Sequence, residues 1–195
     1  MPRRTAEQAE VTRAAILAAA RKQFAEEGFH ASLASIVAEA GVTKGALFHH
    51  FPNKLALFRE VWTDLQQSMQ EEANAEAARN MAVDDPYVQF LAGALVYLKW
   101  AAKPEYFKIV LYEGPVVLGV QGWYESNREL GQRSVRLAME ALAQQGKIDP
   151  RRVSAYSVLV QSALNGAGIA LAERLDGLTP DTMYDAFETM IRNLR

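Results

Sequence analysis

The stretch of residues 32–54, SLASIVAEAGVTKGALFHHFPNK, constrains the fold more than any other part of the chain. Ser32 can cap a helix, because its side-chain oxygen accepts hydrogen bonds from the unpaired N–H groups of the first turn. Gly41 favours the left-handed turn that ends this helix, and Thr43 can cap a second helix directly afterwards. The pattern therefore predicts two short helices that meet at a tight turn.

The second of these helices has two different sides. Leu47 and Phe51 share one side at i, i+4 spacing and are expected to face a core. The outward side is small and basic, and it carries Lys44, Gly45, Ala46, Phe48 and His49. Two helices joined by a glycine-containing turn, the second with such an outward side, are typical of a helix-turn-helix that reads DNA.

The run T-K-G-A-L-F-H-H-F-P-N-K, residues 43–54, resembles the recognition helix of TetR-family transcriptional regulators. By motif the resemblance covers residues 8–60, and beyond them it extends only by architecture. It implies a helix-turn-helix DNA-binding domain in residues 1–54 (the head) and a ligand-binding and dimerisation domain in residues 55–195 (the body). A helix over residues 53–80 would link the two. The resemblance also implies a repressor that leaves its operator when a small molecule binds.

Nine residues of the head are expected to bind DNA. Thr43 and Lys54 lie at the starts of predicted helices, where free N–H groups and the helix dipole favour phosphate. For Thr43, capping alone is the alternative, and the two roles are compatible. Ala46 could meet a thymine methyl group. The full set is Ser32, Thr43, Lys44, Gly45, Ala46, Phe48, His49, His50 and Lys54.

The distribution of charge agrees with this interpretation. The whole chain has a formal net charge of −2, but residues 1–59 carry eight Lys/Arg and five Asp/Glu, so the remainder is distinctly acidic. All three histidines also lie in the first 50 residues. A mildly basic head on an acidic body is expected of a DNA-binding protein with a separate regulatory domain.

The rest of the chain predicts an all-α fold of about nine helices, because apolar residues recur at helical spacing and no strand-like alternation occurs. A short helix or turn is expected over residues 105–112, and the Gly/Pro cluster at 114–119 is not expected to form regular helix throughout. The other helices are predicted over residues 5–27, 53–80, 87–102, 123–145, 150–174 and 181–194.

Several classes of function are disfavoured by the residues present. Cysteine is absent, which excludes disulfides and thiolate chemistry and fits a reducing cytoplasm. No histidine follows residue 50, so a Ser-His-Asp triad cannot form within the body, and no nucleotide-binding motif occurs. The histidines lack metal-ligand spacing. We therefore expect no enzyme, metal or cofactor, and, without an apolar leader or spanning segment, a cytoplasmic protein with no membrane contact.

Several aromatic residues lie in the middle of the body sequence. Two amide side chains occur within the apolar helix predicted over residues 150–174. These residues could be ordinary bundle core. The resemblance favours a mostly apolar pocket with a few polar groups that orient a small-molecule effector. The predicted pocket residues are Tyr97, Trp100, Phe107, Leu111, Trp123, Gln161 and Asn165.

Two apolar stripes occupy the last two predicted helices. Burial within one chain is one interpretation, and a two-fold four-helix interface, as in TetR-like regulators, is the other. A homodimer would place two reading helices on a palindromic double-stranded operator. The predicted interface residues are Val160, Leu164, Ala167, Leu171, Met183, Phe187 and Met190.

A second function remains open from the sequence alone. The chain could be a helical small-molecule binding protein whose head does not recognise a DNA sequence. Salt separates the two possibilities, because a protein that contacts several phosphates loses affinity steeply as the salt concentration rises.

Overall fold

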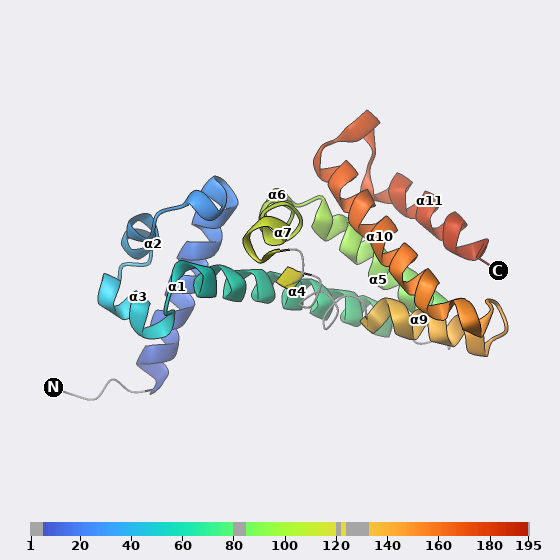
Figure 1. The fold of residues 1–195 in the computed structure, drawn as a ribbon, viewed down its shortest axis with the longest axis horizontal. Coiled ribbons are helices and arrows are strands. Elements are labelled where there is room, and N and C mark those ends of the chain that lie inside the picture. The colour runs from blue at the N-terminus through green and yellow to red at the C-terminus, as the bar shows by residue number, and fades with distance from the viewer. Residues whose placement is uncertain (1–5, 80–84, 120–121, 124–132, 195) are drawn as a thin grey trace.

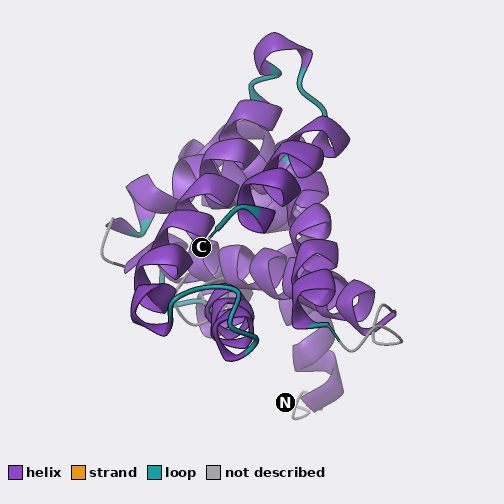
Figure 2. Ribbon diagram, turned by 90° about the vertical axis from the view of Figure 1, so that its right-hand side faces the viewer, coloured by secondary structure: helices purple, strands orange, loops and turns teal. Residues whose placement is uncertain are grey.

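The computed structural model describes residues 6–79, 85–119, 122–123 and 133–194. Within these ranges all regular secondary structure is helical, as Figure 2 shows. The predicted all-α class is therefore confirmed. Figure 1 shows the head at one end of a long helix, α4, and the body packed along the other part of that helix.

The head is built from three helices and a 3₁₀ turn around an aromatic core. The elements are α1 (Ala6–Glu27), η1 (Gly28–His30), α2 (Leu33–Glu39) and α3 (Lys44–His50). Gly28 ends α1 with a positive φ of 66°, as the sequence predicts. The ring of Phe58, from α4, lies 5.2 Å from that of Phe24 and 5.4 Å from that of Phe29. Edge-to-face contacts of this kind fasten α4 to the head.

The helix α4 (Lys54–Arg79) belongs to the core of both parts. Its first turns bury Leu57 and Phe58 in the head, and its later turns bury Trp62, Leu65 and Met69 against the body. Among the described elements, α5 (Pro86–Ala101) makes the most extensive contact with it. A single rigid helix thus connects the two units.

The body consists of helices that pack beside α4 and α5. They are α6 (Pro104–Tyr106), the π-helix η2 (Phe107–Glu113), α7 (Gly114–Val117), α9 (Arg133–Gln144), α10 (Val153–Ala172) and α11 (Pro180–Arg192). Asp85 caps α5, and Thr179 forms a capping box with Thr182 at the start of α11. In Figure 1, α10 and α11 lie at the end of the molecule away from the head.

The segment of residues 104–119 departs from regular α-helix, as the sequence predicts, but it does so mainly through a π-helix rather than a break. Residues 104–117 are helical without interruption, and residues 107–113 form a π-helix. Pro115 lies where the π-helix passes into α7, and it has no N–H group to donate to the preceding turn. After residue 117 the chain leaves the helix, and Gly119 has a positive φ of 73°. Of the helix predicted over 123–145, residues 124–132 lie outside the described residues.

One described helix, residues 150–172, is long and apolar enough to cross a membrane by length and composition alone. The core helix of a soluble protein passes the same test. Here α10 packs against α5 and α9 within the body.

Candidate DNA-reading surface and ligand cavity

The turn between α2 and α3 is a complete Schellman motif. The N–H of Val42 donates to the carbonyl of Val37, and the N–H of Gly41 donates to the carbonyl of Ala38, both at 3.2 Å. Gly41 supplies the positive φ of 63° that the motif requires. Ser32 starts α2 by accepting from the Ser35 N–H at 2.9 Å. These local bonds fix the angle between the two helices.

The helix α3 is anchored on one side and open on the other. Thr43 accepts from the Ala46 N–H at 3.1 Å, and Leu47 and Phe51 are buried in the head. Of the predicted DNA-binding residues, Ser32, Thr43, Lys44, Gly45, Phe48 and His49 are exposed, and Ala46, His50 and Lys54 are partly buried. The structure thus gathers the predicted reading residues on the solvent side of α3, with Ser32 and Lys54 at the starts of α2 and α4.

Two lysines of this surface lie over aromatic rings. The Lys44 ammonium is 5.9 Å from the centre of the Phe48 ring, one helical turn away. The Lys54 ammonium is 4.7 Å from the Phe29 ring, and partial burial there lowers its pKa below the ordinary lysine value, although Glu27 opposes the shift. The Lys54 ammonium therefore lies against the head, whereas Lys44 stays exposed.

Ion pairs hold α1 against its neighbours and so orient α3. Arg13 pairs with Glu60 of α4, and its guanidinium lies 5.6 Å from the centre of the Phe51 ring. Lys22 pairs with Glu39 of α2 at 2.7 Å. Arg13 thus ties α1 to α4 beside Phe51, the residue that ends α3, and Lys22 ties α1 to α2.

The head touches the body at a junction that the sequence did not reveal. Arg21 of α1 pairs with Glu105 of α6 at 2.7 Å, and its guanidinium is 3.6 Å from Asp64 of α4. Beside it, a Cβ placed on Gly28 would lie only 2.1 Å from the Glu113 carboxylate of η2. The start of the body, α6 and η2, therefore contacts the end of α1 directly.

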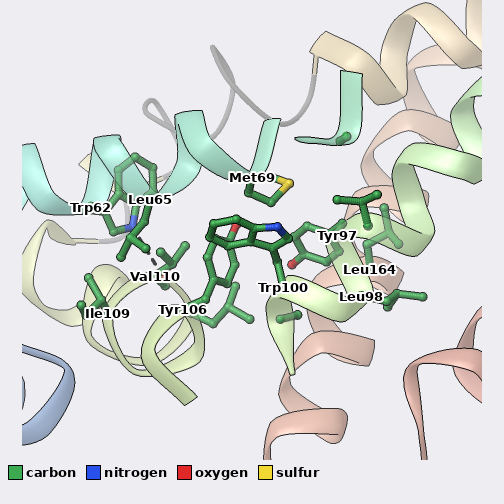
Figure 3. Close-up of a cluster of buried hydrophobic side chains, with 14 of the residues drawn as sticks. Trp62, Leu65, Met69, Tyr97, Leu98, Trp100, Tyr106, Ile109, Val110 and Leu164 are labelled. Carbon is green, nitrogen blue, oxygen red and sulfur yellow. Dashed lines mark hydrogen bonds between the residues drawn. The ribbon is translucent and has the colours of Figure 1, made fainter. Parts of the chain in front are cut away.

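The same π-helix also packs on α4. The indole N–H of Trp62 donates to the Val110 carbonyl at 3.4 Å. Gly114 lies so close to Trp62 that a Cβ there would come within 2.8 Å of the indole nitrogen. Figure 3 shows Trp62 and Val110 facing each other across this contact.

A cavity of about 270 Å³ lies in the body between α4, α5, η2, α9 and α10. Four of the predicted pocket residues line it: Tyr97, Leu111, Gln161 and Asn165. The Tyr97 hydroxyl donates to Asn165 Oδ1 at 2.9 Å, and Gln161 Nε2 donates to the same oxygen at 3.1 Å. The structure thus joins residues of α5 and α10 in one polar cluster.

The other three predicted pocket residues lie outside the lining of this cavity. Trp100 donates its indole N–H to Glu72 at 2.7 Å, and the Lys103 ammonium covers its ring at 3.5 Å. Phe107 lies beside Tyr112, with ring centres 6.0 Å apart. Trp123 approaches Gly114. Of these three, Trp100 packs against a lining residue, with its ring centre 5.6 Å from that of Tyr106.

Sequence reasoning missed the contribution of α4 to the cavity. Gln66, Gln70 and Asn74 recur at i, i+4 spacing and face it. Their spacing was a usable signal, but amides on a helix ordinarily indicate a solvated face. Gln66 is instead almost completely buried and accepts a hydrogen bond from the Tyr106 hydroxyl.

Aromatic rings close the side of the cavity near α6. The ring of Tyr106 lies 6.4 Å from that of Tyr97 and 5.6 Å from that of Trp100, both edge to face. In Figure 3 these three rings lie together below Met69. Burial raises the pKa of Tyr97 and of Tyr106 well above the ordinary tyrosine value, so both phenols stay neutral.

The predicted dimer-interface residues differ in their exposure within the single chain. Val160, Leu164, Leu171 and Phe187 are buried within the single chain, Ala167 and Met183 are partly buried, and Met190 is exposed. The outward face of α10 carries Leu159, which is 62% exposed, together with Val158 and Ile169. Because α10 is apolar on more than one face, its periodicity does not tell which face meets the core.

The described residues contain no group of three or more His, Cys, Asp or Glu side chains that could hold a metal ion. The two candidate sites are the exposed side of α3 in the head and the cavity in the body, whose lining carries no charged side chain among the described residues.

Comparison with known proteins gives matches over both parts. Residues 16–61 match the family of bacterial regulatory proteins called tetR. Residues 87–194, more than half of the chain, match the tetracyclin repressor-like C-terminal domain. The HTH-type transcriptional repressor BepR of Brucella suis is 44% identical over 78 residues, which are 40% of this chain and 37% of that protein. The matched regions span about half the length of the curated relatives or less.

Solved structures resemble the chain over nearly its full length. A TetR-family transcriptional regulator from Pectobacterium atrosepticum is 30% identical, with a TM-score of 0.72, covering 96% of this chain and 94% of that one. The fatty acid degradation regulator FadR from Bacillus halodurans shares the fold, with a TM-score of 0.76 over 94% of this chain and 100% of that one, at 14% identity. These relatives are regulators rather than enzymes. The chain therefore belongs to the TetR family of bacterial regulatory proteins.

Proposed function

We propose that this protein is a ligand-responsive transcriptional repressor that binds a palindromic operator as a homodimer and leaves it when a small molecule occupies the cavity. The observation that carries the proposal is the helix α3, which is capped and anchored on its inner side and presents Lys44, Gly45, Phe48 and His49 to solvent. A helix of this kind fits the major groove. The family membership supports the same interpretation.

The N-termini of α3 and α4 lie at the edges of this surface and are suited to bind phosphate. Thr43 and Asn53 cap them through the N–H groups of Ala46 and Ala56. The remaining N–H groups of each first turn point outward, where the helix dipole favours an anion. Lys44 and Lys54 add positive charge at the same two positions. Phosphate contacts at these positions would fix the register of α3 in the groove.

The exposed apolar faces of α10 and α11 support a two-fold interface. Leu159 and Ile169 of α10 and Met190 of α11 are all exposed in the single chain. Gly166, also exposed, lies between the two α10 residues, and a Cβ placed on it would have no neighbouring atom within 4 Å, which leaves room for a second helix to approach. A homodimer joined there would hold two heads at a fixed separation, as a palindrome requires.

The cavity and the head share structural elements, which supports coupling between ligand and DNA. Val110 and Leu111 of η2 line the cavity, while Glu113 of the same π-helix meets Gly28 of the head. On the other wall, α4 contributes to the cavity and also carries the head. A ligand changes operator affinity only if it binds the two arrangements of these elements differently.

The test is selection of bound sequences from a random duplex pool with the purified protein at low salt. We expect a palindrome with half-sites about one helical turn apart. Lys44→Ala should weaken operator binding, whereas Lys99→Ala, which removes an exposed lysine of the body, should not. Failure to enrich any sequence with ligand-free protein would favour the alternative, a helical binding protein without sequence-specific DNA recognition. As a DNA-binding regulator, the protein is expected to act in the cytoplasm.

A further inference from the structure

The walls of the cavity are polar in places but carry no charge among the described residues. Six amide side chains line it, namely Gln66, Gln70, Asn74, Gln89, Gln161 and Asn165. Three hydroxyl groups, from Tyr97, Tyr106 and Ser134, join them. No Lys, Arg, His, Asp or Glu of the described part of the chain belongs to the lining.

The remaining surface of the cavity is apolar. Its larger apolar side chains are Met69, Phe90, Val110, Leu111, Val135, Leu137 and Leu164. The volume of about 270 Å³ lies just below the range of typical ligand pockets, about 300–1,000 Å³, which suits a small organic molecule. Most of the surface of a bound molecule would therefore meet hydrocarbon.

The hydrogen bonds among these side chains do not use every donor and acceptor of the amides. Asn165 Oδ1 already accepts from Tyr97 and from Gln161. This arrangement leaves the Asn165 NH₂ group as a donor and the Gln161 carbonyl as an acceptor, one helical turn apart on α10. A donor and an acceptor placed side by side complement a hydroxyl or a carboxamide.

The opposite wall repeats this chemistry. Gln70 Nε2 donates to Asn74 Oδ1 at 2.9 Å, and Gln66 bonds to the Tyr106 hydroxyl. Amides can donate and accept, so they satisfy neutral polar groups without any counter-charge. A carboxylate or an ammonium group in the same place would lose its hydration without meeting an opposite charge, which is far more costly.

We propose that the cavity selects an uncharged, mostly apolar molecule that carries a hydroxyl or carboxamide group, bound by Gln161 and Asn165, and that it discriminates against carboxylates and ammonium ions. The inference deepens the proposed function and rests on it for its regulatory meaning. Binding itself does not depend on DNA, so the two can be tested separately.

Four probes with one biphenyl frame provide the test: 4-phenylphenol, biphenyl-4-carboxamide, biphenyl-4-carboxylate and 4-phenylbenzylammonium. Calorimetry with the full-length protein at neutral pH, without DNA, measures their affinities. We expect the two neutral probes to bind and the two ions to bind at least about tenfold more weakly. Equal or tighter binding of either ion, or binding by none of the four, would overturn the proposal.

Variants locate the polar contact. Asn165→Leu should lower the affinity for 4-phenylphenol by about tenfold or more, because the phenol loses its hydrogen bond. The affinity for 4-methylbiphenyl, which has no polar group, should stay unchanged. Gln161→Leu should act in the same direction and provides a second variant if the first does not fold. Gln67→Leu, next to Gln66 but exposed on α4, is the matched control and should change neither affinity. Equal losses for both probes would indicate general damage to the cavity and overturn the assignment.

The proposed function is then tested by adding 4-phenylphenol to the complex of the protein with the selected operator and measuring release of the DNA by fluorescence anisotropy. If 4-phenylphenol binds in the calorimeter but leaves the operator complex intact, the ligand class stands and the coupling to DNA fails. If the operator is never bound, the DNA-binding proposal fails while the calorimetric result keeps its meaning.

Discussion

The Arg21 guanidinium donates two parallel hydrogen bonds to the Glu105 carboxylate, from Nε to Oε1 and from Nη2 to Oε2, each 2.7 Å long. Arg21 belongs to α1 of the head, and Glu105 belongs to α6 of the body. Hydrogen bonding to Glu105 raises the pKa of Arg21 above its ordinary value against the effect of partial burial, and the negative charges of Glu105 and Asp64 add to the rise. A paired fork of this kind fixes orientation as well as distance.

A double-mutant cycle should measure this connection. Arg21→Met and Glu105→Gln together should show a coupling energy of about 1 kcal/mol in urea unfolding, because the pair is bidentate but partly exposed. The pair Arg136 and Glu140, which lies within α9, is the control and should couple more weakly. Additive effects at Arg21 and Glu105 would show that the bond does not tie the head to the body.

Substitution of Gly28 should destabilise the protein for two separable reasons. Gly28→Ala places a side chain at a positive φ, which costs about 1–2 kcal/mol, and it also displaces the Glu113 carboxylate. Gly41→Ala has a similar φ but no neighbouring atom within 4 Å, so it carries the backbone cost alone. Thermal unfolding should show a larger loss of stability for Gly28→Ala than for Gly41→Ala, and the two losses should become equal in a Glu113→Ala background. Equal losses with Glu113 present would contradict the contact between Gly28 and Glu113.

Capping and phosphate contact at Thr43 can be distinguished by one substitution. Thr43→Asp preserves an N-cap of equal or better quality, so the unfolding free energy should stay within about 1 kcal/mol of the native value. The new carboxylate should lower operator affinity by about tenfold or more, because it faces phosphate. Thr179→Asp makes the same change at the cap of α11 and should leave operator binding unaltered. Unchanged affinity with Thr43→Asp would place Thr43 away from the DNA backbone.

Asp85 should make the stability of the body depend on pH. It accepts a hydrogen bond from the Tyr87 N–H and lies 3.6 Å from the Lys147 ammonium, and both effects lower its pKa below the ordinary value. A lowered folded-state pKa contributes stability that is complete above about pH 4 and is lost as the pH falls through the folded-state pKa. Asp85→Asn keeps the cap without the ionisable group. The stability difference between the two proteins in urea should therefore shrink in acid, and a constant difference would contradict this account.

The outward face of α10 should control assembly. Leu159→Glu places a charge in the proposed two-fold interface, and sedimentation velocity should show monomers where the native protein shows dimers. Val116→Glu, at a 79% exposed position of α7, provides the control and should remain dimeric. A dimer that survives Leu159→Glu would move the interface to another face.

The head could be predicted from the sequence because its signals are local. Ser32, Gly41 and Thr43 act through hydrogen bonds to residues a few positions away, so their roles do not depend on distant packing. Capping and turn chemistry therefore placed α2 and α3 within a residue or two of their bounds. The reading surface followed, because Leu47 and Phe51 had to face inward.

The body resisted prediction because its signals are not local. α10 is apolar around most of its circumference, and whether Val160 or Leu159 faces inward depends on where α5 and α9 lie. Likewise, Trp100, a predicted pocket residue, lies outside the cavity lining and bonds to Glu72, whereas Gln66, for which the sequence predicts no role, lines the cavity. The π-helix at 107–113 adds a register change that periodicity cannot show.

The length of α4 has a consequence for operator geometry. With 26 residues and a rise of 1.5 Å each, the helix is about 39 Å long. Rotating a rod of that length by about 5° displaces its far end by about 3.4 Å, which equals the rise of one base pair. In the proposed dimer, a rotation of about 5° would therefore place a head one base pair out of phase with its half-site.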